Sequence, residues 1–144
     1  MTHSTQALRS WYMGMFQIPR LAEWSMHARG GKLMQRNLVK AGLPEAQARA
    51  AAELLQEPGA ATGALNWYRA ISPGSLKEAA AVDVPTLYVW STGDVALGRY
   101  AAEHTGDWVT GPYRFEVLAN VSHWIPTEAP DRVAELVLEH AASV

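Results

Sequence analysis

The stretch Pro85-Thr86-Leu87-Tyr88-Val89-Trp90-Ser91-Thr92-Gly93-Asp94 decides the fold. Residues 85–90 are a continuous apolar, β-rich run, which predicts a strand buried on both faces, as in a parallel sheet. An acidic residue, Asp94, follows this strand, and active-site residues of open α/β sheets lie beyond the carboxyl ends of strands. A helix is expected from Val95 to His104, and Asp94 could instead serve as its N-cap.

A second strand and a final helix are predicted further along the chain. Tyr113–Leu118 alternates weakly between apolar and polar residues, and Pro130-Asp131 opens an amphipathic helix. The order strand, helix, strand, helix is typical of α/β proteins with parallel strands and crossover helices. Because two strands alone make a marginal sheet, we expect this part to be the end of a larger sheet whose earlier strands are absent.

The first half of the chain has a helical pattern. Four helices are predicted there, over residues 21–29, 32–41, 43–56 and 60–71. The composition changes at Ser72-Pro73-Gly74. We therefore expect a helical domain over residues 1–72 and an α/β domain over residues 73–144.

Composition and charge exclude several classes of function. The net charge is −2 with no basic run, so neither a nucleic acid nor an anionic membrane is an expected partner. No signal peptide or apolar run of membrane-spanning length is present, and a cytoplasmic location is expected. Cysteine is absent, the histidines show no ligand-like spacing, and no glycine-rich phosphate loop occurs. We therefore expect no metal and no cofactor.

A histidine follows the second predicted strand, in Asn120-Val121-Ser122-His123-Trp124. His123 could take a proton near neutral pH, although a half-buried loop histidine with no catalytic role is the structural alternative. An acid after one strand and a histidine after the next is the second half of the nucleophile–acid–histidine order of α/β-hydrolases. In this order Asp94 and His123 point to a shared site.

Two segments carry a resemblance to a known family. VPTLYVWSTGD (residues 84–94) and YRFEVLANVSHWIPTEAPDRVAELVLEH (residues 113–140) resemble the acid and histidine segments of epoxide hydrolases and haloalkane dehalogenases. The resemblance implies the C-terminal portion of an α/β-hydrolase fold, with catalytic Asp94 and His123. It also implies that residues 1–72 form a helical cap, or lid, domain.

Two further segments separate epoxide chemistry from the alternatives. Residues 10–19 (SWYMGMFQIP) resemble the start of an epoxide hydrolase cap, and residues 64–69 (ALNWYR) resemble its end. Each carries a tyrosine, Tyr12 or Tyr68, where the family has a cap phenol. Phenols, with an ordinary pKa of about 10, can donate hydrogen bonds to the oxygen of an opening epoxide. Dehalogenases instead hold a halide with ring N–H donors, so the pair favours an epoxide, although each tyrosine could simply pack through its ring.

Aromatic residues near these segments are candidates for contact with a small apolar substrate: Phe16, Trp67 and Trp124. Other acidic residues, including Glu128, are interpreted as solvated charges or helix starts.

The nucleophile is the feature that the sequence lacks. In the family, the nucleophile is an aspartate on a sharp turn that precedes the cap, and no such turn is found before Tyr12. We therefore expect the chain to be inactive alone, and either to pair with a separate N-terminal hydrolase half or to self-associate. The alternatives are a haloalkane dehalogenase or esterase portion, and a non-catalytic truncated remnant or binding subunit.

Overall fold

The chain forms two compact units. The computed structural model describes residues 6–71 and 80–143, and its two units are Met1–Arg9 with Ala80–Val144, and Ser10–Ala79. The predicted domain boundary at residues 72 and 73 lies outside the described residues, so the division into domains 1–72 and 73–144 stays a prediction. In the described part of the chain, no helix has the length and apolar character needed to cross a membrane.

The unit Ser10–Ala79 is helical. Its elements are α2 (Trp11–Phe16), α3 (Leu21–His27), α4 (Lys32–Lys40), α5 (Glu45–Leu54) and α6 (Ala60–Arg69). The four helices expected from the sequence are α3 to α6, and each ends one or two residues before its expected end. The short helix α2 was not expected.

The helical unit closes around a small apolar cluster. Ala22 and Met26 of α3 pack there with Ala61 and Leu65 of α6. The turn into α4 requires glycine, because Gly31 has φ +80° and an added Cβ would lie 2.9 Å from the side chain of Gln56. On each of α3 and α6, a small and a larger apolar residue four positions apart thus build this cluster.

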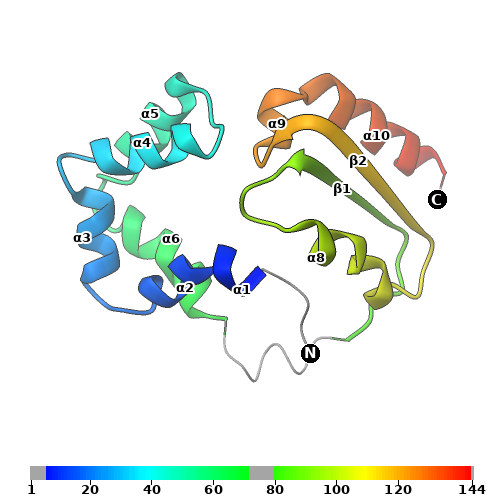
Figure 1. Cartoon of the computed structure of the whole chain (residues 1–144), viewed down its shortest axis with the longest axis horizontal. Helices are drawn as coiled ribbons and strands as arrows, with labels where there is room; N and C mark the ends of the chain where they lie inside the picture. Colours follow the sequence, from blue (N-terminus) through cyan, green and yellow to red (C-terminus); the bar gives the residue numbers. More distant parts are fainter. Residues whose placement is uncertain (1–5, 72–79, 144) are drawn as a thin grey trace. The chain divides into compact units, whose positions relative to one another are not determined.

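The second unit contains a parallel strand pair. β1 (Thr86–Gly93) pairs with β2 (Tyr113–Ser122), with Thr86 opposite Tyr113. The other elements are α1 (Gln6–Arg9), α8 (Arg99–Glu103), the 3₁₀ helix η1 (Thr105–Trp108), α9 (Ile125–Glu128) and α10 (Pro130–Ala142). In Figure 1, α8 and α10 lie on opposite sides of the strand pair. The predicted parallel α/β arrangement is confirmed.

Two expectations about this unit need correction. The predicted helix over residues 95–104 begins only at Arg99, because Asp94 accepts hydrogen bonds from the N–H groups of Ala96 and Leu97 and turns the chain first. The predicted burial of β1 on both faces is reached only at Trp90 and Ser91; the preceding residues of the strand are half-buried. Among the described residues, β2 is the only strand that pairs with β1.

Candidate active site

The structure brings Asp94 and His123 into contact. Asp94 follows β1, His123 follows β2, and the ends of parallel neighbours meet at the same sheet edge. Asp94 Oδ2 lies 3.0 Å from His123 Nδ1. The Asp94 side chain is 3% exposed and that of His123 is 36% exposed. When Nδ1 carries the proton and donates it to Asp94, Nε2 is left free to accept a proton.

The two oxygens of Asp94 have different partners. Oδ2 holds His123, whereas Oδ1 accepts the N–H groups of Ala96 at 2.7 Å and Leu97 at 2.8 Å. The capping alternative from the sequence is thus met in part, since Asp94 holds two backbone amides, but those amides belong to a turn and not to a helix. The hydrogen bonds from these two N–H groups fix the plane of the Asp94 carboxylate, so that Oδ2 points at the imidazole.

Glu128 anchors the loop that carries His123. Its carboxylate accepts the Ser122 backbone N–H and the Ser122 hydroxyl, each at 2.7 Å. These two hydrogen bonds, the backbone one first, lower the pKa of Glu128. Ser91 Oγ donates to the Ser122 carbonyl at 2.8 Å from the other side. Glu128 is exposed and lies in the first turn of α9, which agrees with its interpretation as a solvated charge or helix start. Its hydrogen bonds to Ser122 could not be predicted, because no local pattern separates it from other acids in the first turn of a helix.

A cavity of about 250 Å³ adjoins the Asp94–His123 pair, within the same unit. Tyr88 and Trp90 of β1 and Ile125 of α9 contribute to its lining. Burial, and then the nearby charge of Asp94, raise the pKa of Tyr88, so its hydroxyl stays protonated near neutral pH. The side chains of Asp94 and His123 thus lie beside a largely apolar cavity.

Trp124 lies directly beside the histidine. Its ring meets that of His123 edge-on, with centroids 5.4 Å apart. The indole N–H is buried and has no hydrogen-bond partner among the described residues. Trp124 therefore packs against one side of the imidazole.

In the helical unit, Tyr12 and Tyr68 lie close together. Tyr12 is on α2 and Tyr68 is near the end of α6, and their ring centroids are 6.2 Å apart in an edge-on arrangement. Phe16 contacts both, with its centroid 5.3 Å from Tyr12 and 5.0 Å from Tyr68. The two segments that resemble the ends of a cap therefore meet in one aromatic cluster.

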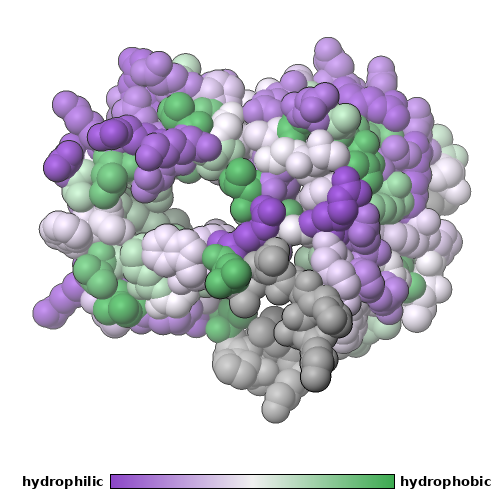
Figure 2. All heavy atoms as spheres, in the orientation of Figure 1, coloured by the Kyte–Doolittle hydropathy of each residue, from purple (hydrophilic) through white to green (hydrophobic). Residues whose placement is uncertain are grey.

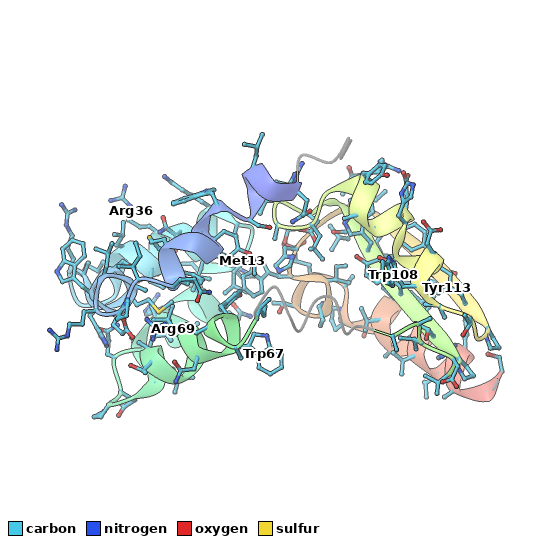
Figure 3. All side chains as sticks on the ribbon, turned by 90° about the horizontal axis from the view of Figure 1, so that it is seen from below. Met13, Arg36, Trp67, Arg69, Trp108 and Tyr113 are labelled. Carbon is cyan, nitrogen blue, oxygen red and sulfur yellow. The ribbon has the colours of Figure 1, made fainter. Side chains whose placement is uncertain are left out.

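An ion pair holds this aromatic cluster together. Arg69, next to Tyr68, donates to the Phe16 carbonyl at 3.0 Å and binds Glu23 of α3 at 2.7 Å and 3.1 Å. Gln17 donates to the Tyr68 carbonyl at 3.1 Å. In Figure 3, Arg69 lies at the end of α6. Neither Arg69 nor Glu23 was singled out from the sequence, because they are 46 residues apart in the chain.

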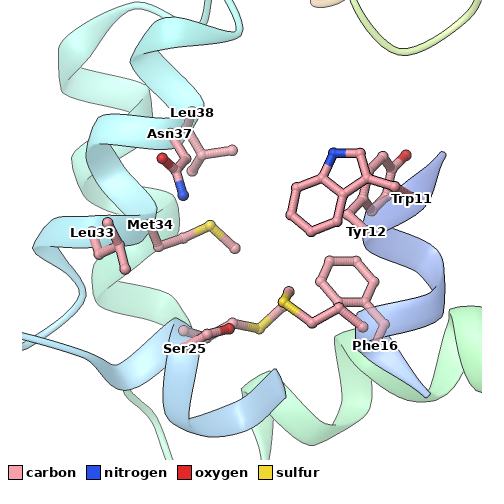
Figure 4. Close-up of a pocket in the computed structure, with 10 residues that line it drawn as sticks. Trp11, Tyr12, Phe16, Ser25, Leu33, Met34, Asn37 and Leu38 are labelled. Carbon is pink, nitrogen blue, oxygen red and sulfur yellow. The ribbon is translucent and has the colours of Figure 1, made fainter. Parts of the chain in front are cut away.

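A larger apolar cavity opens beside Tyr12. Its volume is about 410 Å³, and Figure 4 shows Trp11, Tyr12 and Phe16 of α2 facing Met34 and other residues of α4. The remaining residues that line it are Met15, Ser25, Met26, Leu33, Asn37 and Leu38. Trp11 and the α4 residues were missed by sequence reasoning, since their apolar spacing is that of any amphipathic helix.

Trp67 is placed differently from the other candidates. It is 79% exposed, it projects from α6 in Figure 3, and it does not line the cavity beside Tyr12. Its contact with a substrate stays a prediction. No group of three or more potential metal ligands occurs among the residues that the structure describes.

Comparisons with known proteins agree on one superfamily. No protein-family model matches the chain. The chain is 27% identical over 146 residues to epoxide hydrolase 3 of Xenopus tropicalis, covering 95% of this chain and 40% of that protein. It is 31% identical over 140 residues to the AB hydrolase superfamily protein YfhM of Bacillus subtilis, covering 94% of this chain and 49% of that protein.

Solved structures give the same result. A mutant epoxide hydrolase from Bacillus megaterium superposes with a TM-score of 0.74 at 19% identity, over 98% of this chain and 54% of that one. An epoxide hydrolase of the α/β-hydrolase superfamily from metagenomes of hot environments superposes with a TM-score of 0.72 at 27% identity, over 97% of this chain and 52% of that one.

The chain therefore has a partial α/β-hydrolase fold, and the resemblance inferred from the sequence is confirmed: its homologues are epoxide hydrolases and other α/β-hydrolase superfamily proteins. It spans about half the length, or less, of the curated relatives it matches.

Proposed function

We propose that this chain contributes Tyr12, Tyr68, Asp94 and His123 to the hydrolysis of a small apolar epoxide through a covalent ester. The observation that carries the proposal is the 3.0 Å contact between Asp94 Oδ2 and His123 Nδ1, because it leaves Nε2 of a partly exposed imidazole available as a base. The close pair of phenols in the helical unit favours an epoxide over other superfamily substrates.

The first step forms the ester. A carboxylate attacks one epoxide carbon, the bond between that carbon and the ring oxygen breaks, and the oxygen develops negative charge. Tyr12 and Tyr68 donate hydrogen bonds to this oxygen, which stays bonded to the other epoxide carbon and becomes a hydroxyl group once it gains a proton. Phenols suit this task because they remain protonated at neutral pH.

The second step consumes water. His123 Nε2 takes a proton from a water molecule, and the resulting hydroxide attacks the ester carbonyl. The bond between the carbonyl carbon and the alkoxy oxygen of the ester then breaks. The alkoxide takes a proton from protonated His123 and leaves as the diol, and the carboxylic acid loses its proton to restore the carboxylate. Asp94 holds the imidazole in the required tautomer and stabilises its positive charge once it is protonated.

The cavity beside Tyr12 supports the apolar part of the proposal. A cavity of 150 Å³ lined by apolar residues can hold benzene, so about 410 Å³ has room for a substituent larger than one ring. We propose that this cavity takes the substituent while Tyr12 holds the oxygen. In this proposal residues 1–72 act as the cap and residues 73–144 as part of the catalytic core.

The nucleophilic carboxylate is proposed to come from outside this chain. No residue in it matches the nucleophile turn of the family, and the relatives are about twice as long or more. A separate N-terminal hydrolase half is the proposed source of this carboxylate. Self-association of the chain is the alternative, and it would not supply the nucleophile.

Activity of the chain alone is the first test. We expect no diol from styrene oxide above a buffer blank, measured by chromatography, since the ester cannot form without the carboxylate. Turnover that survives repurification and disappears in His123→Ala would show that the chain contains its own nucleophile.

Ligand binding is the second test, and it does not require turnover. The carbonyl oxygen of an N-benzyl amide accepts hydrogen bonds as an epoxide oxygen does, and its ring fits the cavity. We expect Tyr12→Phe and Tyr68→Phe each to weaken binding by about twofold to tenfold, the loss of one net hydrogen bond. Tyr100→Phe, in the other unit, is the matched control. Unchanged affinity in both cap variants would contradict the epoxide proposal.

A further inference from the structure

The short helix α1 holds the loop that carries Asp94. Gln6 Nε2 donates to the Ala96 carbonyl at 2.8 Å, and Gln6 Oε1 accepts the Gly98 N–H at 2.9 Å. Arg9 Nη1 donates to the carbonyl of Asp94 itself at 3.0 Å. Three hydrogen bonds therefore connect α1 to residues 94–98, across 85 to 92 positions in the sequence.

The loop of residues 94–98, which carries Asp94, needs such support because it contains no helix or strand. Residues 94–98 lie between β1 and α8, and Asp94 and Gly98 are buried. Asp94 Oδ1 satisfies the N–H groups of Ala96 and Leu97 from within the loop. The bonds from α1 then engage the Ala96 carbonyl and the Gly98 N–H, which the carboxylate leaves unused.

The geometry points to Gln6 and Arg9 as positioning residues for Asp94. We propose that they fix the backbone that directly follows this carboxylate, which keeps Oδ2 on His123 Nδ1 and so keeps the proton off Nε2. The inference rests on the proposed function for the catalytic meaning of that tautomer, but the tautomer itself can be measured without any substrate. Neither residue touches the imidazole, so both act through Asp94.

Loop protection is measured first. Hydrogen–deuterium exchange with residue-level fragmentation is run on the full chain and on Gln6→Ala, Arg9→Ala and Arg9→Lys. We expect the Gly98 amide to exchange roughly tenfold faster in Gln6→Ala, where its acceptor is lost, and the Ala96 and Leu97 amides to follow in Arg9→Ala. Arg9→Lys keeps a cationic donor and should stay near the original rate. Arg132→Ala, an exposed arginine on α10, is the matched control.

The tautomer of His123 is measured second, because hydrogen bonds from α1 that only stabilise the loop would not alter it. With ¹⁵N-labelled histidine, His123 is assigned through His123→Gln, and its ring shifts report which nitrogen carries the proton. We expect Nδ1 to carry it in the original chain and in Arg9→Lys, and a mixture of tautomers in Gln6→Ala and Arg9→Ala.

The outcomes separate the alternatives. Faster loop exchange with unchanged ring shifts would overturn the positioning role and leave only a structural contact. Unchanged exchange and unchanged shifts would overturn it entirely. If Arg9→Ala also loses protection along the β1–β2 ladder and is therefore unfolded, Gln6→Ala and Arg9→Lys decide. The exchange rates and ring shifts do not depend on whether the chain takes part in epoxide hydrolysis. The positioning role of Gln6 and Arg9 and the proposed function can therefore be contradicted independently.

Discussion

Asp94 shows how a single side chain can serve structure and chemistry together. One carboxylate oxygen closes a backbone turn, and the other meets the imidazole of His123. Replacing the carboxylate with an amide would keep one acceptor but put a donor on the other position. Function and local folding are therefore coupled at this residue.

The ion pair between Glu23 and Arg69 leads to a prediction about acid stability. Arg69, which donates to both oxygens of Glu23, is the main cause that lowers the pKa of Glu23 from 4.5 to about 2. A carboxylate with a lowered pKa in the folded state stabilises the fold above its unfolded pKa, and this contribution is lost as pH falls toward 2. We expect Glu23→Gln to lower the melting temperature by a few degrees at pH 7 and to have no effect near pH 2.

Circular dichroism melts at pH 7, 4.5, 3 and 2 measure this difference. The control is Glu135→Gln, which removes the exposed pair with Arg132 and should change the melting temperature little at any pH. A difference between Glu23→Gln and the original chain that persists at pH 2 would show that the ion pair is not its source.

At the scale of elements, the end of the strand pair is shaped by a local irregularity. The register of β1 against β2 shifts between Ser91 and Gly93, and Asn120 on β2 has φ +60°. The Asn120 N–H donates to Thr92 Oγ1 at 3.0 Å, which bridges the irregular region. The shift directs the chain after β1 toward the end of β2, where His123 follows.

Gly93 is required at this irregularity. An added Cβ would lie 2.5 Å from the Val121 carbonyl oxygen, a backbone atom that cannot move without breaking the strand pair. We expect Gly93→Ala to reduce the free energy of unfolding by about 1–3 kcal/mol and to weaken the Asp94–His123 contact. Urea denaturation followed by fluorescence measures it.

Gly63→Ala is the matched substitution. Gly63 lies inside α6 with no atom within 4 Å of an added Cβ. Alanine there should stabilise the helical unit by about 0.5–1 kcal/mol, because it lowers the entropy of the unfolded chain. Equal effects at the two glycines would refute the steric argument for Gly93.

At the scale of the whole molecule, much apolar surface remains exposed. Trp11, Trp24, Trp108 and Leu138 are each at least 60% exposed, and Figure 2 shows hydrophobic atoms among hydrophilic ones on the visible surface of both units. Among the described residues β1 pairs with β2 alone, so its other edge offers backbone groups for pairing. Exposed strand edges beside apolar surface promote association.

We therefore expect the isolated chain not to persist as a compact monomer. It should self-associate, aggregate, or form a complex when a partner that supplies neighbouring strands is present. Size-exclusion chromatography with light scattering, over a range of concentrations, measures the mass. A sharp monomer peak at every concentration, together with a cooperative melt, would show that the chain closes its own core.

The sequence by itself determined the longer helices, the two strands and their order, but not the short helices α1, α2, α9 and η1. Helical periodicity predicted α3 to α6, and an apolar run followed by Asp94 and a second strand followed by His123 predicted a parallel pair with both side chains at one edge. These inferences succeed because periodicity is local, and because parallel pairing brings strand ends together whatever the intervening residues.

Only the tertiary structure decided what surrounds those residues. Arg9 binds the carbonyl of Asp94, 85 positions away, and Arg69 binds Glu23, 46 positions away. Asp94 accepts hydrogen bonds from two backbone N–H groups that follow it, so that α8 begins only at Arg99. Such contacts depend on how separate segments pack, and a polar side chain that will be paired has the same local pattern as one that faces water. The order of the elements is therefore encoded locally, whereas the partners of each polar group follow from packing.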